Sequence, residues 1–308
     1  MSCKSSSLFY ADTGEGKTGQ VGSWAKYVKK STGKKVRLYT AEPGGLGTIE
    51  HLIDAGLIDV WDISTRPNHF ETLDFAARGY WPDPSNPSKL VVPDAQVYDV
   101  YGGFAFEGAT AFGEMLLEEL RVKGAANEII GAEKAPQQFT SGTLRVAGSN
   151  QTHYGIVQSR VRKAINDSQR LPVHILWTAR ELKVRDDDDP KKQYVYGPLL
   201  AGQAATLAMP AWFGNTIHIS SRKVRTVGPD KKETERIIRK AHFTKHYDEG
   251  SDIPYLAQLR LPPELMSEMP SSLDLTPDLE TMVLLFSKMD ELRAKAREQY
   301  KNSLQQTK

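Results

Sequence analysis

Residues 8–18 read Leu-Phe-Tyr-Ala-Asp-Thr-Gly-Glu-Gly-Lys-Thr, a short apolar run followed by a glycine turn that ends in Gly-Lys-Thr. The apolar run predicts a buried strand, and the residues after the turn predict a helix over about 17–30. Such glycines let backbone N–H groups converge on phosphate oxygens, and the positive end of the helix favours the same anion. The stretch therefore predicts a binding loop for a nucleoside triphosphate.

Each residue of this loop is expected to contribute to the nucleotide site. Lys17 is placed to reach the β- and γ-phosphates of ATP, and the Thr18 hydroxyl to hold Mg²⁺. Ala11 stands where such loops usually begin with glycine. The residues expected to bind the nucleotide are Ala11, Asp12, Thr13, Gly14, Glu15, Gly16, Lys17, Thr18 and Gly19.

Further along the chain, apolar runs alternate with helical stretches. This alternation is typical of an α/β fold with a largely parallel sheet flanked by helices. The expected strands after the first are 36–41, 57–63, 102–106, 173–178 and 216–220, and the expected helices are 48–55, 68–78, 110–121 and 154–168.

Two acidic residues follow strands of this expected sheet. Glu42 comes after the run 36–41, and Glu107 comes after the run 102–106. Ligands of open α/β sheets bind outside the carboxyl ends of the strands, so both carboxylates are expected to face the nucleotide. Glu42 is the candidate for orienting or deprotonating the attacking water, with a capping or surface role as the alternative. Glu107 is the candidate metal-side acid, with Asp99 as its rival.

The order of these features resembles the RecA-like phage P-loop ATPases, a phage nucleotide-binding AAA family related to single-strand-annealing RecA-type recombinases. The resemblance runs from Leu8 to about Pro262, and it includes Thr40-Ala-Glu-Pro-Gly-Gly45 and Trp177-Thr-Ala179. It implies a RecA-like ATPase core over residues 1–262 and a C-terminal extension over residues 263–308.

The resemblance also implies roles for individual side chains. Lys17 and Thr18 match the residues that bind phosphate and Mg²⁺, Glu42 matches the RecA-type catalytic glutamate, and Glu107 falls at the metal-side acid. Thr178 ends the strand that carries a γ-phosphate sensor in this fold. RecA proteins use glutamine there, and a packing role in the strand is the alternative for this threonine.

Three cations are candidates for contact with the γ-phosphate. Arg180 lies two residues beyond Thr178 and is expected to sense phosphate or to meet a neighbouring subunit. Lys245 and Arg260 lie where RecA-like assemblies bring a cation to the phosphate of a neighbour, with a solvated surface role as the alternative. A trans cation would imply a homo-oligomer, either a ring or a filament.

The resemblance places single-stranded DNA at two loops, 136–151 and 185–196. The second loop contains the acidic run 186–189, which phosphate would repel. The first loop offers side chains for stacking and phosphate contact, namely Phe139, Arg145, Asn150 and Gln151.

The C-terminal segment predicts an amphipathic helix. Thr276-Pro-Asp278 supplies an N-cap with proline at the first helical position. The apolar stripe is expected to dock on the core, with a partner or self-association surface as the alternative. Its members recur at helical spacing and are Met282, Leu285, Phe286, Met289 and Leu292.

The composition of the chain limits which ligands and partners are expected. The 308 residues carry a formal net charge of +2, so DNA binding would need local loops or grooves rather than global attraction. The single cysteine, Cys3, excludes an internal disulfide and a cysteine-based zinc site. Seven histidines lack metal-ligand spacing, and His51, His69 and His153 each stand alone, so a zinc site is not expected. Without an apolar run of about 18 residues or a signal peptide, we expect no membrane partner and a cytoplasmic protein, in the host cytoplasm if phage-encoded.

The sequence thus predicts an ATP-hydrolysing, Mg²⁺-dependent enzyme of RecA-like phage type. Its expected action is on DNA, in recombination, single-strand annealing or replication. An ATPase motor or assembly factor, such as one for phage DNA packaging, shares the core without free single-strand binding. A nucleotide-dependent binding module with little turnover is the third possibility.

Overall fold

The computed structural model describes residues 4–125, 138–141, 144–147, 151–185, 193–201, 203–227, 233–248 and 251–306. The strands are β1 (Ser6–Ala11), β2 (Lys35–Thr40), β3 (Ile58–Asp62), β4 (Trp81–Asp83), β5 (Asn86–Val91), β6 (Tyr101–Glu107), β7 (Gln138–Ser141), β8 (Leu144–Ala147), β9 (His174–Arg185), β10 (Tyr194–Pro198), β11 (Asn215–Val227), β12 (Glu233–His242), β13 (His246–Tyr247), β14 (Pro254–Tyr255), β15 (Gln258–Leu259) and β16 (Ser272–Asp274). The helices are α1 (Lys17–Thr32), α2 (Glu50–Asp54), α3 (His69–Ala77), α4 (Val97–Val100), α5 (Ala109–Ala125), α6 (Gln151–Gln169), α7 (Gln203–Ala208), α8 (Pro263–Met266) and α9 (Thr281–Gln306).

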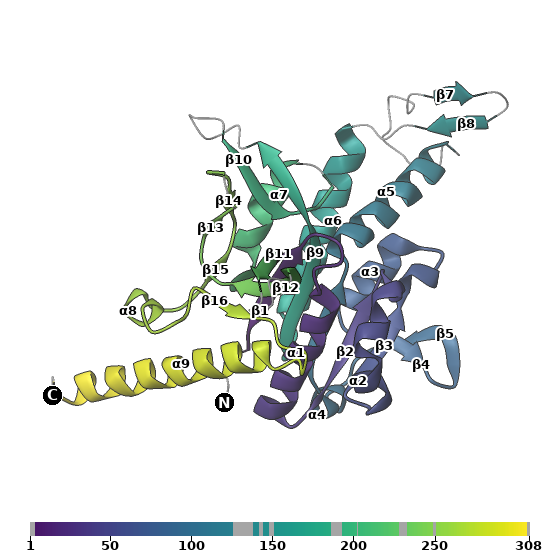
Figure 1. The fold of residues 1–308 in the computed structure, drawn as a ribbon. Helices are drawn as coiled ribbons and strands as arrows, with labels where there is room; N and C mark the ends of the chain where they lie inside the picture. Colours follow the sequence, from purple (N-terminus) through teal and green to yellow (C-terminus); the bar gives the residue numbers. More distant parts are fainter. Residues whose placement is uncertain are drawn as a thin grey trace.

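The centre of the molecule is a parallel sheet in the order β11-β1-β9-β6-β2-β3 (Figure 1). Successive side chains of a strand point to opposite faces, so Phe9 enters one buried cluster while Leu8 and Tyr10 enter the other. Helices α1, α2 and α9 cover the face of Phe9, and α3, α5 and α6 cover the other. The expected α/β fold with a largely parallel sheet flanked by helices is confirmed.

This topology gathers the expected site residues at one edge of the sheet. β1 and β9 are paired in parallel so that Ala11 lies opposite Arg180. β2 and β6 are paired in parallel so that Thr40 lies opposite Glu107. Because the carboxyl ends of parallel strands meet at the same edge, the glycine loop, Glu42 and Glu107 lie together there.

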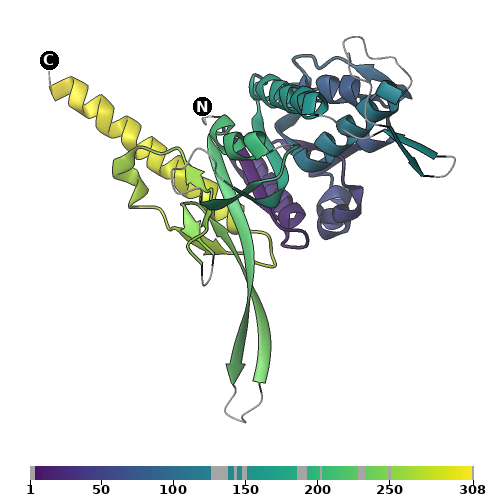
Figure 2. The same ribbon diagram turned by 90° about the horizontal axis from the view of Figure 1, so that it is seen from above.

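Antiparallel strands extend the sheet beyond the parallel core. β10 pairs with the second half of β9, and the whole of β12 pairs with residues 218–227 of β11. The β11/β12 hairpin projects far from the body of the molecule (Figure 2). β10 and β12 are absent from the sequence-based expectation. β12 is mostly polar and shows neither a long apolar run nor strict alternation, the two patterns that signal a strand.

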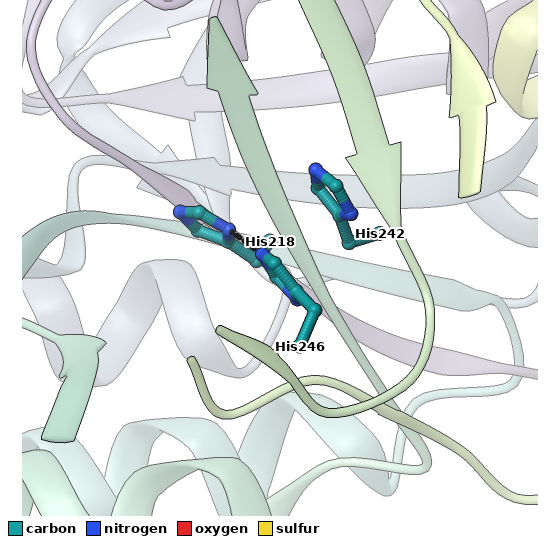
Figure 3. A group of neighbouring side chains, drawn as sticks. All are labelled: His218, His242 and His246. Atoms are coloured by element: carbon teal, nitrogen blue, oxygen red, sulfur yellow. Dashed lines mark hydrogen bonds between the residues drawn. The ribbon is translucent and has the colours of Figure 1, made fainter. Parts of the chain in front are cut away.

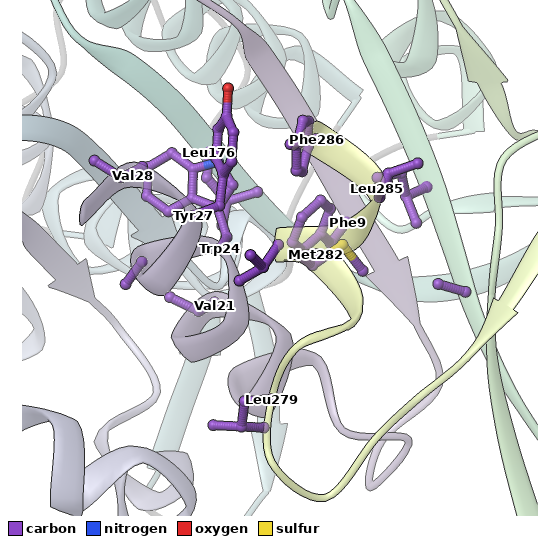
Figure 4. Packing of buried hydrophobic residues seen from close by; sticks show 14 of the residues in the cluster. Phe9, Val21, Trp24, Tyr27, Val28, Leu176, Leu279, Met282, Leu285 and Phe286 are labelled. Atoms are coloured by element: carbon purple, nitrogen blue, oxygen red, sulfur yellow. The ribbon is translucent and has the colours of Figure 1, made fainter. Parts of the chain in front are cut away.

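The C-terminal helix α9 packs its first half against α1 (Figure 4). The ring of Phe286 stacks on Tyr27, with centroids 5.1 Å apart, and on Phe9, with centroids 6.5 Å apart. The Met282 backbone N–H donates to Ser23 Oγ at 2.8 Å. Docking on the core is thus the observed role of the apolar stripe. All of its members are buried, namely Met282, Leu285, Phe286, Met289 and Leu292.

Among the described residues, the helices are too short or too polar for any of them to span a bilayer.

Candidate functional site

The loop between β1 and α1 turns on two glycines with positive φ, +83° at Gly14 and +95° at Gly16. A residue with a Cβ atom is strained at positive φ, which explains why both positions are glycine. The Lys17 ammonium folds back over the loop and donates to the carbonyls of Ala11, at 3.0 Å, and Asp12, at 2.8 Å. Burial of this ammonium lowers the pKa of Lys17 from its ordinary value, while the nearby Glu42 and Asp12 carboxylates oppose that shift.

The loop borders a cavity of about 570 Å³. Its walls come from the glycine loop and the start of α1, from the turn after β2, and from the middle of β9. The lining residues are Thr13, Gly14, Gly16, Lys17, Thr18, Gly19, Glu42, Gly44, Gly45, Thr48 and Arg180. A volume of this size suits a small-molecule ligand.

Beneath the cavity, the Thr18 hydroxyl donates a hydrogen bond to Oε1 of Glu107. Glu107 is only 2% exposed, and this burial raises the pKa of its carboxyl to about 7, with the Thr18 bond opposing the shift. Its other oxygen, Oε2, is buried and finds no hydrogen-bond partner among the described residues. An orphaned carboxylate oxygen beside a threonine hydroxyl is an oxygen donor set that fits Mg²⁺.

The rival acid, Asp99, lies elsewhere. It is exposed on the short helix α4, which precedes β6 and therefore lies at the amino end of that strand. Thr18 and the glycine loop lie at the carboxyl end of the parallel sheet. The structure thus brings Glu107, and not Asp99, to the side chain expected to hold the metal.

Two glycines let the turns around these acids pack closely. A Cβ atom on Gly45 would lie 2.7 Å from Thr18 Oγ1, closer than real Cβ atoms approach a neighbour. Gly108, directly after Glu107, has a φ of +95°, and a Cβ there would lie 3.2 Å from Glu42 Cγ. The turn after β2 therefore fits against the glycine loop only because position 45 has no side chain.

Glu42 lines the cavity as an ion pair with Arg180. Its Oε1 accepts from Arg180 Nη2 at 2.6 Å and from Nε at 3.0 Å. Arg180 also reaches Glu114 on α5, at 3.3 Å. The two residues that the sequence assigns to water activation and phosphate sensing are thus bonded to one another here, so each would have to exchange this contact to act on a nucleotide.

Thr178 is buried and is not among the residues that line the cavity. Its side chain is 1% exposed, and its hydroxyl accepts from the backbone N–H of Gly108 at 2.9 Å. This contact holds the end of β6 against β9. The contact agrees with a positioning role in the strand, and the γ-phosphate sensor remains a prediction.

The remaining predicted residues are dispersed. Arg260 is exposed, and it follows β15, which pairs with the amino end of β11, away from the glycine loop. Lys245 is exposed beside Tyr247. In the expected DNA loops, residues 136–137, 142–143, 148–150 and 186–192 lie outside the described residues, and Asn150 is among them. Phe139, Arg145 and Gln151 are described only in their backbone, within β7, β8 and α6.

Sequence reasoning missed the contact between the β11/β12 hairpin and the glycine loop. Ser221 Oγ on β11 donates to Glu15 Oε1 at 2.9 Å. A Cβ on Gly16 would lie 3.9 Å from Cδ of Arg239 on β12, which places this arginine beside the loop. Only the pairing of β12 with β11 brings residue 239 there, and no local motif signals that pairing.

No protein-family model matches this chain, and no curated protein matches it. Among solved structures, a KaiC-like protein from the hyperthermophilic archaeon Pyrococcus horikoshii OT3 is similar, with a TM-score of 0.37 and 9% identity, over 82% of this chain and 90% of that chain. A likeness this weak carries no conclusion about family or function.

Proposed function

We propose that this protein is a RecA-like ATPase that binds and hydrolyses ATP with Mg²⁺. One observation carries the proposal: Lys17 and Thr18 border a cavity of about 570 Å³, and Thr18 is bonded to the buried Glu107 carboxylate, which has an orphaned oxygen. Phosphoryl transfer requires backbone groups that bind phosphate, a lysine, and a hydroxyl paired with a carboxylate.

Each part has a distinct role in the proposed reaction. The loop backbone, the N-terminus of α1 and Lys17 would bind and orient the triphosphate. Thr18 and Glu107 would hold Mg²⁺, which neutralises charge on phosphate oxygens. Glu42 would orient or deprotonate the attacking water once its bond to Arg180 is exchanged, and the released guanidinium would be free to meet the γ-phosphate.

ATP hydrolysis by three variants tests these roles. Lys17→Ala should abolish single-turnover hydrolysis. Glu42→Gln should slow it by at least about 100-fold while binding of a fluorescent ATP analogue stays within a few-fold of wild type, because the group acts on the water rather than on binding. Glu50→Gln, an exposed acid on α2, is the matched control and should behave as wild type. Loss of hydrolysis in Lys17→Ala with no change in Glu42→Gln would show that Glu42 is not the catalytic acid.

We further propose that the partner is single-stranded DNA and that the β11/β12 hairpin contacts it. Between residues 220 and 225 and between 235 and 240, six side chains are cationic and only Glu235 is acidic. The hairpin extends away from the body, where a strand can reach it (Figure 2). Clustered Lys and Arg supply the phosphate contacts that dominate such binding, even though the net charge of the chain is small.

Fluorescence anisotropy with a labelled oligonucleotide tests the hairpin. Arg225 and Arg236 are exposed. Replacing both with serine should weaken binding at least about tenfold and lower the salt slope by about 1.4, since each phosphate contact to a single strand contributes about 0.7. The control removes the same charge at Lys29 and Lys30, exposed cations at the far end of α1, and should leave binding near wild type. An equal loss in both double variants would refute a DNA contact at the hairpin.

The response of turnover and assembly to DNA separates the candidate functions. Stimulation of ATP hydrolysis by single-stranded DNA, with a larger mass in ATP, supports the recombinase assignment. If single-stranded DNA changes neither the rate of ATP hydrolysis nor the mass of the assembly, the recombinase assignment is contradicted and a motor or assembly factor is favoured. ATP binding without turnover favours a nucleotide-dependent binding module.

A further inference from the structure

Three histidines converge beside the hairpin base, contrary to the expectation that the histidines lack metal-ligand spacing (Figure 3). His242 and His246 are four positions apart, and His218 lies 24 positions before His242. His218 lies on β11, His242 ends β12 and His246 begins β13. One ring nitrogen from each lies within 4.8 Å of those of the other two. His218 is buried and the other two are half-buried. The register of β11 with β12, which pairs His218 with His242, creates this cluster.

Hydrogen bonds at the rim of the cluster orient two of the rings. His246 Nδ1 lies 3.2 Å from the carbonyl of Thr244, which can only accept, so Nδ1 carries the hydrogen and Nε2 keeps its lone pair. His218 Nε2 lies 2.6 Å from a carboxylate oxygen of Glu181. When that carboxylate is ionised, Nε2 carries the hydrogen and His218 Nδ1 keeps its lone pair.

Two lone pairs then face each other inside the cluster. His218 Nδ1 and His246 Nε2 are 2.9 Å apart. Two nitrogens that bind one tetrahedral zinc ion lie about 3.3 Å apart, since each Zn–N bond is about 2.0–2.1 Å. If the two nitrogens moved apart by about 0.4 Å, a zinc ion would fit between them. Both lone pairs would then bind the ion instead of repelling each other.

We propose that His218, His242 and His246 form a binding site for a divalent transition-metal ion, with zinc as the preferred occupant. Three imidazoles and one open position are a donor set that zinc takes in proteins. Burial lowers the pKa of each ring, to about 3 for His218 and His242 and about 4 for His246, so the rings are neutral and available as ligands at neutral pH.

One ring must turn for the site to close. His242 stacks on His246 with centroids 3.8 Å apart and an angle of 10° between the planes, so their in-plane lone pairs do not meet at one point. His242 Nε2 is held by the Ser220 hydroxyl at 2.9 Å. The ring also lines a cavity of about 410 Å³, which gives it room to rotate and gives the ion an entry path and a fourth ligand position.

Glu181 would act as the outer partner of the site. A carboxylate that accepts the second ring hydrogen of a ligating histidine fixes its orientation and strengthens it as a donor. His218 is also held by ring contacts with Tyr10, at 4.9 Å between centroids, and with Tyr255, at 4.1 Å. The ligand nearest the core is thus already oriented, while the two half-buried histidines can adjust.

Zinc titration of the untagged full-length chain tests the proposal. The protein is stripped with EDTA and titrated against a chromophoric chelator at pH 8, where Glu181 is ionised, because burial raises its pKa only to about 7. Excess Mg²⁺ is present to occupy oxygen ligands such as Thr18 and Glu107, since imidazoles select zinc over Mg²⁺. Wild type should bind one equivalent, and Co²⁺ in its place should give the visible spectrum of a tetrahedral nitrogen site.

The variants separate a built site from surface binding. His246→Ala should lower zinc affinity at least about 100-fold, and Glu181→Gln about 10–100-fold. His51→Asn removes an exposed histidine of α2 and should leave binding unchanged. Circular dichroism checks that each variant is folded, and the Co²⁺ spectrum of wild type needs no variant at all. Absence of a tight equivalent in wild type, or an unchanged affinity in folded His246→Ala, would overturn the proposal and leave a stacked histidine cluster without a metal.

Discussion

Replacing Glu107 with glutamine should change how the stability of the protein depends on pH. Burial raises the pKa of Glu107 from 4.5 to about 7, so the folded chain holds a proton on this carboxyl at pH values where the unfolded chain has released it. The stabilisation is fully present below pH 4.5 and is lost as the pH rises through about 7. Glutamine keeps the shape of the side chain and removes the titration.

The size of the effect follows from the two pKa values. Between pH 5 and pH 8, the proton on Glu107 changes the free energy of unfolding by about 2.5 kcal/mol, since one pH unit is worth about 1.4 kcal/mol while only the folded chain holds the proton. Relative to wild type, Glu107→Gln should therefore gain about 2.5 kcal/mol on going from pH 5 to pH 8.

Urea unfolding at pH 5 and pH 8 in EDTA, followed by tryptophan fluorescence and by circular dichroism, measures this difference. Coincident curves from the two probes are required before free energies are compared. Asp99→Asn, at the other end of β6, removes an exposed carboxyl and should show no such change. A difference below about 0.5 kcal/mol for Glu107→Gln would refute the reasoning, because the buried carboxyl would then hold no extra proton. In wild type, added Mg²⁺ should stabilise more at pH 8 than at pH 5, because it needs the ionised form.

Two further predictions use matched pairs of positions. Gly45→Ala should weaken Mg²⁺-ATP binding at least about tenfold, because a methyl group would displace the Thr18 hydroxyl. Gly47 does not line the cavity and a Cβ there meets nothing within 4 Å, so Gly47→Ala should bind as wild type in the same calorimetric titration. Phe286→Ala should lower the free energy of unfolding by about 3–5 kcal/mol, because the ring is buried between α1 and the sheet. Leu284 lies on the exposed side of α9, so Leu284→Ala should change the free energy of unfolding by less than about 0.5 kcal/mol. An equal loss in Phe286→Ala and Leu284→Ala would show that α9 does not dock as described.

Local patterns in the chain were sufficient for the central sheet. Runs such as 36–41 and 102–106 are apolar because both faces of a central parallel strand are buried, so they stand out without knowledge of their partners. The same reasoning placed Glu42 and Glu107 at strand ends, on one edge of the sheet. It failed for β12, whose mostly polar residues show neither a long apolar run nor the strict alternation that signals a strand.

The sequence by itself determined the glycine loop and the alternation of strands and helices in the central parallel sheet, because these depend on neighbours a few residues apart. Only the tertiary structure decided that Glu107 rather than Asp99 meets Thr18, that Glu42 pairs with Arg180, and that the three-histidine cluster forms at all. Each of these contacts joins distant parts of the chain: 89 positions separate Thr18 from Glu107, 138 separate Glu42 from Arg180, and 28 separate His218 from His246. They depend on strand register, where a shift of one residue would turn each side chain to the opposite face.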